Sequence, residues 1–241
     1  MNQSDLIPFP DTETLVQQVA GRWLDAVDAA NTAGKPFHVA LSGGRVAGRF
    51  MAAAHGLGTS RRTCWDTVHF HWGDERCVPP DHADSNYKLA QSALLDPAGI
   101  DAACRHRLCG ELPPEEAARL AEAELARVTG TASGSVPVLD LVFLGMGEDG
   151  HVASLFPGAP QSVVTSTGWV IPVIGPKPPP QRLSLTFQVL AAAKEVWVLA
   201  SGAGKEEALK ESLRIGGNTP LAQLLSLRSH TRIMTDLPLP V

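Results

Sequence analysis

The chain has 241 residues, of which 44% are hydrophobic and 19% charged, and its formal net charge is −5. This composition excludes fibrous and largely disordered chains, and the length allows one large α/β domain or two small ones. Lysine and arginine are scattered, so no basic face is expected to bind duplex nucleic acid, although a few converging cations could still hold a small anion.

The four cysteines, Cys64, Cys77, Cys104 and Cys109, form no Cys-x-x-Cys pair and have no histidine at zinc-finger spacing. We therefore expect buried structural thiols. The N-terminal segment lacks the basic and apolar regions of a signal peptide, and no apolar run approaches the roughly 20 residues that span a bilayer. These features predict a cytoplasmic protein without a membrane partner.

The first predicted elements are a helix and a strand. Apolar residues recur at spacings of three and four over positions 15–30, which predicts a helix that ends near Gly34. The apolar run Phe37–Leu41 then predicts a buried strand that leads into a tight turn at Gly43 and Gly44.

Strands and helices alternate along the rest of the chain. Further strands are expected at 68–72, 139–144, 169–174, 183–187, 196–200 and 231–234, and further helices at 86–95, 114–128, 205–213 and 221–227. Near-continuous apolar strands that alternate with helices predict an α/β fold, with a mostly parallel sheet covered on both faces. No Ser/Gly linker divides the chain, so a single α/β domain over residues 1–241 is expected.

In such a sheet ligands bind beyond the carboxyl ends of the strands, so the residues after each strand are the candidates for a site. Ser42, Gly43, Gly44 and Arg45 follow the first of these strands. The glycines allow close backbone approach, and the N-terminus of the next helix offers N–H groups to an anion. A plain βα turn is the alternative interpretation.

Three charges, Asp74, Glu75 and Arg76, follow the strand at 68–72 directly. Charged residues that directly follow a buried strand cost free energy unless water solvates them or they serve a binding or catalytic function. A charged surface loop is therefore the alternative to a functional site here.

The segment Gly145 to Gly150 matches the dinucleotide fingerprint G-x-G-x-x-G and follows a strand. However, no Asp or Glu lies between His151 and Ala193 to hold a ribose, and Glu148 and Asp149 would repel a pyrophosphate. The dinucleotide interpretation fails for these reasons. A glycine turn that presents Asp149 and His151 remains, and an imidazole with an unperturbed pKa near 6.5 is suited to act as a general base.

The segment from Ser201 to Lys205 resembles a phosphate-binding P-loop only superficially. Leu199 stands where the motif needs its first glycine, and Glu206 replaces the required Ser or Thr. Lys205 beside a helix N-terminus could still pair with one phosphate, and Arg182, which opens its strand after a proline run, is a second candidate cation.

Taken together, these segments resemble the 6-phosphogluconolactonase family, within the glucosamine-6-phosphate isomerase/6-phosphogluconolactonase group. The matching segments are LSGG at Leu41, WGDERCVP at Trp72, SNYKLA at Ser85, LGMGEDGHVASLFPG at Leu144, PKPPPQRLSLT at Pro176 and SGAGK at Ser201. The resemblance implies a Rossmann-like fold, no organic cofactor, no metal, and hydrolysis of 6-phosphoglucono-δ-lactone in the oxidative pentose phosphate pathway.

The resemblance also implies roles for individual residues. It makes His151 the general base and Asp74 and Arg76 substrate-binding charges. Our mechanistic hypothesis adds that Asp149 or another carboxylate orients the imidazole, that Arg76 stabilises the oxyanion and that Asp74 accepts from the sugar hydroxyls, so these four are the candidate catalytic residues. The candidate substrate-binding residues, which would hold the phosphate, are Ser42, Gly43, Gly44, Arg45, Arg182 and Lys205. The only expected partner is the phosphorylated sugar lactone, bound by a monomer or a homodimer.

Two departures from related sequences affect this interpretation. The family usually continues LSGG with Ser-Thr-Pro, whereas this chain has Arg45-Val46-Ala47, so a guanidinium would have to replace two hydroxyl donors. The amino-sugar phosphate deaminases/isomerases of the same group carry a glutamate seven positions after the Asp of the DGH motif, and Phe156 stands there in this chain. That difference favours the lactonase, while a non-catalytic sugar-phosphate sensor on the same fold stays an alternative.

Overall fold

The computed structural model describes residues 3–238, which form a six-stranded and a three-stranded sheet. All pairings in the larger sheet are parallel, in the order β1-β9-β8-β5-β2-β3. Its strands are β1 (Gln3–Pro8), β2 (Phe37–Leu41), β3 (Val68–Trp72), β5 (Leu141–Gly145), β8 (Glu195–Ala200) and β9 (His230–Thr235). The predicted mostly parallel α/β sheet is confirmed.

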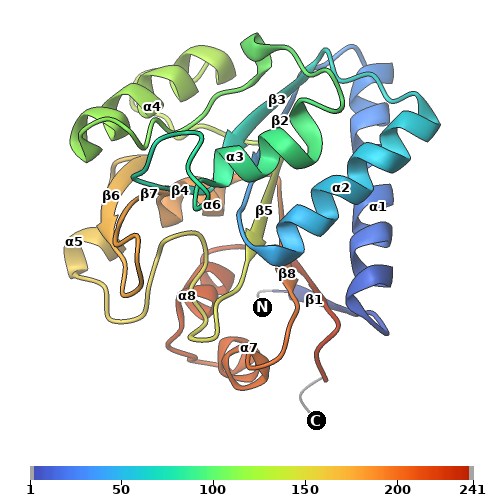
Figure 1. Ribbon diagram of the computed structural model, residues 1–241. Coiled ribbons are helices and arrows are strands. Elements are labelled where there is room, and N and C mark those ends of the chain that lie inside the picture. Colours follow the sequence, from blue (N-terminus) through green and yellow to red (C-terminus); the bar gives the residue numbers. More distant parts are fainter. Residues whose placement is uncertain (1–2, 239–241) are drawn as a thin grey trace.

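Helices cover both faces of this sheet. They are α1 (Thr12–Thr32), α2 (Arg45–Arg61), α3 (Asn86–Ala90), α4 (Pro114–Thr129), α5 (Gln161–Val164), α6 (Phe187–Ala192), α7 (Glu206–Leu213) and α8 (Pro220–Ser226). Figure 1 shows α1 and α2 side by side on one face, with α6 and α8 on the other. No helix among residues 3–238 is both long and apolar enough to cross a membrane.

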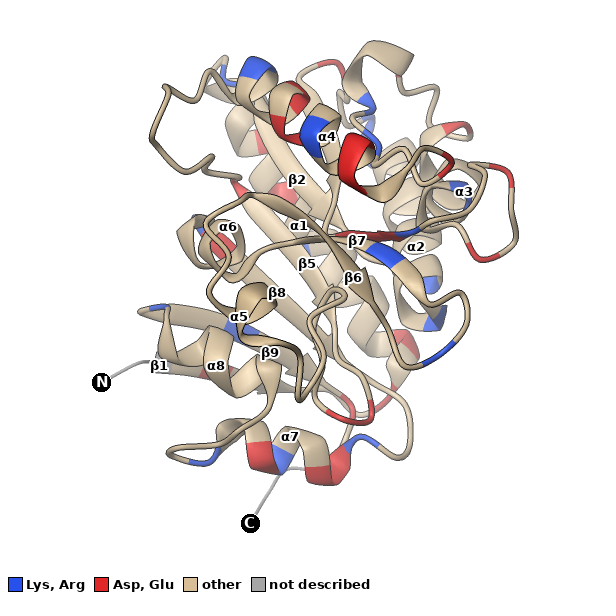
Figure 2. Cartoon of the chain, turned by 90° about the vertical axis from the view of Figure 1, so that its left-hand side faces the viewer, with Lys and Arg blue, Asp and Glu red and all other residues tan. Residues whose placement is uncertain are grey.

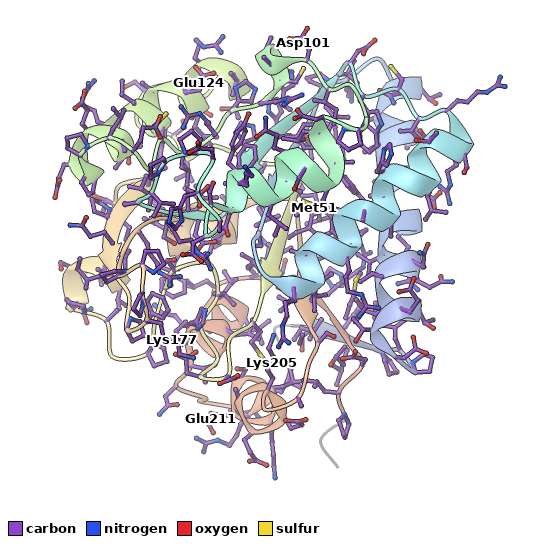
Figure 3. The ribbon with its side chains drawn as sticks, viewed as in Figure 1. Met51, Asp101, Glu124, Lys177, Lys205 and Glu211 are labelled. Atoms are coloured by element: carbon purple, nitrogen blue, oxygen red, sulfur yellow. The ribbon has the colours of Figure 1, made fainter. Side chains whose placement is uncertain are left out.

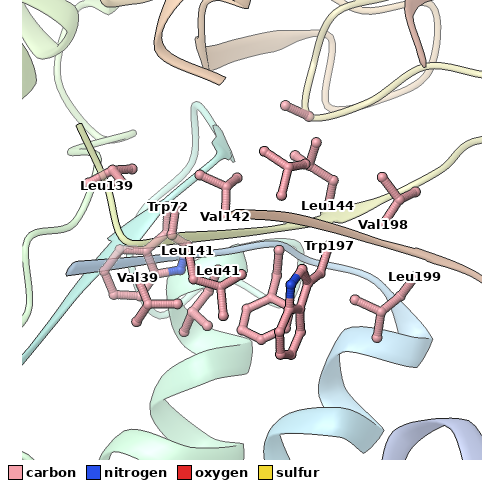
Figure 4. Packing of buried hydrophobic residues seen from close by; sticks show 14 of the residues in the cluster. Val39, Leu41, Trp72, Leu139, Leu141, Val142, Leu144, Trp197, Val198 and Leu199 are labelled. Atoms are coloured by element: carbon pink, nitrogen blue, oxygen red, sulfur yellow. The ribbon is translucent and has the colours of Figure 1, made fainter. Parts of the chain in front are cut away.

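The core lies on either side of the central strands. Side chains alternate along β5, with Val142 and Leu144 on one face and Leu141 on the other, as Figure 4 shows. Trp23 of α1 is fully buried, and its ring centroid lies 5.4 Å from that of Phe143 on β5. Burial of each such side chain contributes about 1.5–3 kcal/mol, which fixes the strands whose carboxyl ends carry the site. Charged positions lie mostly on outer helices such as α4 and α7 and on loops (Figure 2).

The smaller sheet is antiparallel, in the order β4-β7-β6, and α4 packs on it. It contains β4 (Asp74–Arg76), β6 (Val170–Ile174) and β7 (Gln181–Leu185). The sequence pattern placed the last two strands with the parallel ones, which is wrong. The predicted strand at 183–187 is also displaced, because Thr186 is the N-cap of α6 and Phe187 is already helical.

Other predicted elements agree with the structure to different degrees. The strands Phe37–Leu41 and Val68–Trp72 have the predicted bounds. The predicted helix 86–95 is α3 followed by one π-helical turn, Gln91–Leu95. The expectation of buried thiols is right for Cys104 and wrong for Cys64, which is exposed, while Cys77 and Cys109 are half-buried.

Four histidines, His38, His69, His71 and His106, cluster beside β2 and β3 and next to α4. His38 and His69 are paired residues of β2 and β3, and their ring centroids lie 4.8 Å apart. The ring of His106 stacks on those of His69 and His71 at 5.2 and 4.9 Å. Burial lowers the pKa of His38 to about 4 and that of His71 well below its ordinary value, so both imidazoles are neutral at pH 7.

This histidine stack predicts acid sensitivity of the fold. An unfolded imidazole titrates near pH 6.5 and folded His38 near 4, so the stability that neutral His38 contributes is complete above about pH 6.5 and is lost as the pH falls from there toward 4. At pH 5 this one group is expected to cost about 2 kcal/mol of unfolding free energy.

The measurement is the Tm at pH 7.5 and at pH 5.0. The fall in Tm between the two should be smaller in His38→Phe than in wild type, while His82→Gln, at an exposed position, should behave as wild type. An equal fall in wild type and His38→Phe would contradict the role of the stack.

Candidate active site

A cavity of about 560 Å³ opens beyond the carboxyl ends of β2, β5 and β8. It is lined by every predicted site residue but one: Ser42, Gly43, Gly44, Arg45, Asp74, Arg76, His151, Arg182 and Lys205. The exception, Asp149, contacts His151 instead. The predicted residues therefore lie together at the carboxyl ends of the parallel strands, although Asp74, Arg76 and Arg182 belong to strands of the second sheet.

His151 is held at the cavity by a tight turn after β5. The Gly150 N–H donates to the Gly147 carbonyl oxygen at 3.1 Å, and the Gly147 N–H donates to that of His151 at 2.9 Å. A Cβ atom on Gly147 would overlap the His151 imidazole, so this position of the glycine-rich segment must be glycine. Gly147 thus makes room for the imidazole.

Asp149 determines which nitrogen of His151 carries the proton. His151 Nδ1 lies 2.6 Å from Asp149 Oδ1, and the His151 backbone N–H donates to the same oxygen at 3.1 Å. A carboxylate can only accept, so Nδ1 carries hydrogen and Nε2 of the neutral ring is available to accept a proton. Burial alone would raise the pKa of Asp149, but the hydrogen bonds from His151 outweigh it and hold that pKa below its ordinary value. In this arrangement His151 could act as a general base oriented by Asp149.

Arg76 and Arg182 lie opposite each other on neighbouring strands of the small sheet. They are paired residues of β4 and β7, and Arg182 is 7% exposed. Arg182 Nε donates to the Pro179 carbonyl oxygen at 3.1 Å, and its guanidinium lies 5.5 Å from the Phe156 ring centroid. Burial, followed by the Arg76 charge, lowers the pKa of Arg182. Like charges directly opposite each other are destabilising, so an anion between them would be bound favourably.

Lys205 and Arg45 bring two more cations to the cavity from the starts of α7 and α2. Figure 3 places Lys205 between the two helices. Burial lowers the pKa of Lys205, and Arg45 pushes it the same way, while Glu148 acts in the opposite direction. Gly44, the N-cap of α2, has φ 96° and no capping side chain, which leaves the first N–H groups of that helix to a ligand.

The four cations at the cavity lack ion-pair partners of opposite charge among residues 3–238. Arg45, Arg76, Arg182 and Lys205 form no ion pair with a carboxylate in the part of the chain that the structure describes, whereas Arg49, one turn after Arg45, is paired with Glu13 at 2.8 Å. The cavity is therefore electropositive despite the net negative charge of the chain.

Ser42 and Asp74 are more constrained than the sequence suggested. The Ser42 hydroxyl donates to the Phe143 carbonyl oxygen at 2.7 Å, so its side chain can offer a ligand only its lone pairs. Asp74 is 6% exposed, because β4 is a buried strand and not the charged surface loop that the sequence left open. Glu75 accepts the backbone N–H groups of Arg76, Asn86 and Tyr87 at 2.7–2.8 Å, which explains its burial.

Sequence reasoning missed two polar residues at this site, Asn86 and Ser154. Both are at most 2% exposed, and both donate to the Asp74 carboxylate. Each lies inside a segment that carried the family resemblance, but the acceptor they share lies 12 positions from Asn86 and 80 from Ser154. Only the folded structure shows that contact.

The chain is similar to known proteins over most of its length. The family model described as "Glucosamine-6-phosphate isomerases/6-phosphogluconolactonase" matches residues 10–233. A 6-phosphogluconolactonase of Mycobacterium tuberculosis is 36% identical over 223 residues, 89% of this chain and 87% of that protein. One of Streptomyces coelicolor is 36% identical over 219 residues, 88% of this chain and 84% of that protein.

A solved structure is also similar over nearly the whole chain. The 6-phosphogluconolactonase from Trypanosoma cruzi superposes with a TM-score of 0.82 at 26% identity, covering 98% of this chain and 96% of the other. The range matched by the family model includes every segment that lines the cavity. The chain belongs to the glucosamine-6-phosphate isomerase/6-phosphogluconolactonase family.

Proposed function

We propose that this protein hydrolyses 6-phosphoglucono-δ-lactone to 6-phosphogluconate in the oxidative pentose phosphate pathway. The observation that carries the proposal is an imidazole with an accepting Nε2 in a cavity lined by four cations that lack carboxylate partners. The names of the relatives in Mycobacterium tuberculosis and Streptomyces coelicolor support the same reaction.

In this mechanism Lys205, Arg182 and the N–H groups of the glycine turn hold the phosphate. His151 Nε2 takes a proton from water as the water oxygen attacks the lactone carbonyl carbon. Asp149 stabilises the imidazolium that forms, and Arg76 stabilises the negative charge on the carbonyl oxygen. The bond between the carbonyl carbon and the ring oxygen then breaks, and the ring oxygen takes the proton from His151.

The amino-sugar deaminase alternative is weakened by what surrounds His151. The ring centroid of Phe156, at the position where those enzymes carry a glutamate, lies 4.8 Å from that of the imidazole. Proton shuttling on an amino sugar needs a carboxylate at that place, and lactone hydrolysis needs one base only. The Phe156 ring also packs under Arg182, which gives it a structural role.

The experiment that tests the proposal follows loss of 6-phosphoglucono-δ-lactone and release of ammonia from glucosamine 6-phosphate with the same preparation. Lactone loss well above the spontaneous rate, without ammonia release, is expected. Ammonia release alone would favour the deaminase, and binding of the product without turnover of either compound would favour the sensor. A cytoplasmic location, the absence of nucleic-acid partners and a monomeric or homodimeric state stay predictions.

Lys205→Met is expected to raise KM for the phosphorylated lactone roughly tenfold to a hundredfold with little change in kcat. A charge-assisted hydrogen bond to phosphate contributes about 1.5–3 kcal/mol, and it is made equally in the ground and transition states. Steady-state kinetics with background subtraction measures both constants. Lys210→Met, an exposed position on α7, is the control and should leave them unchanged. A fall in kcat at constant KM would show that Lys205 does not bind the phosphate.

A further inference from the structure

The buried carboxylate of Asp74 connects two segments that line the cavity. Its Oδ2 accepts from the Ser154 hydroxyl at 2.7 Å, and its Oδ1 accepts from Asn86 Nδ2 at 3.2 Å. The same Asn86 nitrogen donates to the Asp74 carbonyl oxygen at 2.9 Å. With 6% of the residue exposed, and protein donors on both oxygens, Asp74 has little surface left for a substrate.

On one side, this connection reaches the glycine turn after β2. The Asn86 side chain lies directly against Gly43, where a Cβ atom would overlap its amide oxygen. Asn86 is itself fixed, because its backbone N–H donates to Glu75 at 2.7 Å. The Asp74–Asn86 contact therefore sets the position of the turn that carries Gly43.

On the other side, the hydrogen bond from Ser154 to Asp74 reaches the turn that follows His151. Ala153 has φ 49°, a left-handed conformation that is rare for a residue with a side chain and costs on the order of 1–3 kcal/mol unless the surroundings impose it. Ser154, the next residue, is fully buried, and its N–H donates to Ser184 Oγ of β7 at 3.2 Å. The Leu155 N–H closes the turn on the Val152 carbonyl oxygen at 3.0 Å.

We propose that Asp74 is a positioning residue that acts through Ser154: their hydrogen bond holds the strained turn at Ala153 and thereby fixes His151 over the cavity. This assignment rests on the proposed function and replaces the expectation that Asp74 binds sugar hydroxyls. Removal of the bond lets the turn relax, and His151 then spends less time in the reactive geometry. Misplacement of about 1 Å can cost a hundredfold in rate.

The test is a double-mutant cycle of Ser154→Ala and Asp74→Asn, with kcat and KM measured for the phosphorylated lactone. Ser154→Ala removes one hydroxyl and is expected to lower kcat roughly tenfold or more while KM changes less than about twofold. Because both residues act through one bond, the double variant should be no slower than the slower single variant. Three results would overturn the proposal. They are a tenfold rise in KM for Asp74→Asn, a kcat of the double variant that falls by the product of the two single effects, and an unchanged kcat in Ser154→Ala.

A control and a second readout separate this result from general damage and from failure of the proposed function. Thr231→Val removes a buried hydroxyl near the start of β9, away from the cavity, and should leave kcat and KM unchanged. ¹⁵N NMR of the histidine side chains in the substrate-free protein should show altered His151 signals in Ser154→Ala and not in Thr231→Val. Unaltered His151 signals would refute the positioning role even if the wild type had no lactonase activity, whereas inactive wild type with altered signals would refute only the proposed function.

Discussion

Replacing His151 with alanine is expected to lower kcat for the phosphorylated lactone at least about a hundredfold. General-base catalysis typically contributes 10²–10⁴-fold, and Nε2 of His151 is the accepting nitrogen that the hydrogen bond to Asp149 leaves available. KM should change little, because the cations that hold the phosphate are untouched. The measurement is lactone loss at saturating substrate, corrected for the spontaneous reaction.

His82→Ala serves as the control, since His82 is exposed and lies outside the cavity lining. It should keep the wild-type kcat. A His151→Ala variant that turns over at a rate near that of wild type would show that another group, or the solvent alone, activates the water.

Gly147→Ala is expected to lower kcat roughly tenfold to a hundredfold without unfolding the protein. The added methyl group would overlap the imidazole of His151 and approach Asp149 Oδ1 to 2.7 Å, so the ring must leave its position. The loss is therefore one of geometry, with the base still present. Kinetics and the Tm of the same preparation distinguish displacement of the base from loss of fold.

Gly56→Ala is a matched substitution, because a Cβ atom at this exposed position of α2 meets nothing within 4 Å. It should leave kcat unchanged and raise the Tm slightly, since alanine favours a helix over glycine by about 1 kcal/mol. If Gly147→Ala were as active as Gly56→Ala, the turn would be freer than the structure shows, and the close packing of His151 on Gly147 would have no catalytic consequence.

Local patterns were enough to predict five of the six strands of the parallel sheet, while β1 was not predicted. The bounds of β2 followed from the run Phe37–Leu41, which is buried throughout and apolar except for His38. In β3 two histidines alternate with Val68, Phe70 and Trp72, and Gly73 ends the strand. In the small sheet, β6 and β7 were predicted as strands, although with the parallel ones, and β4 was not predicted. Its strand β4 is the charged sequence Asp-Glu-Arg, which becomes a buried strand only because β7 and α3 supply partners from elsewhere in the chain.

The boundary between β7 and α6 was missed for a different reason. Leu183, Leu185 and Phe187 continue an alternating pattern, which favours a strand through position 187. Thr186 interrupts it as the N-cap of α6. A boundary made by a single residue does not change the spacing of the apolar residues, so the spacing could not predict it.

For the site, the sequence located the residues but not their mutual contacts. Each candidate except Arg182, which opens its strand, follows a predicted strand, and parallel strands end at one edge, so convergence of these residues on one cavity could be expected. The pairing of Arg76 with Arg182 depends on the register of β4 and β7, and the bond from Ser154 to Asp74 spans 80 positions. Neither contact can be predicted from the spacing of residues within one segment. The contact of His151 with Asp149, two residues apart, was the one that local sequence could suggest.

The most direct test of the account compares two lactones with the wild-type protein: 6-phosphoglucono-δ-lactone and unphosphorylated glucono-δ-lactone, each corrected for spontaneous hydrolysis. A cavity in which Lys205 and Arg182 hold the phosphate beside one base predicts catalysis of the first, with a kcat/KM at least about a hundredfold above that of the second. Equal values for the two compounds, or no acceleration of the first over its spontaneous rate, would contradict it.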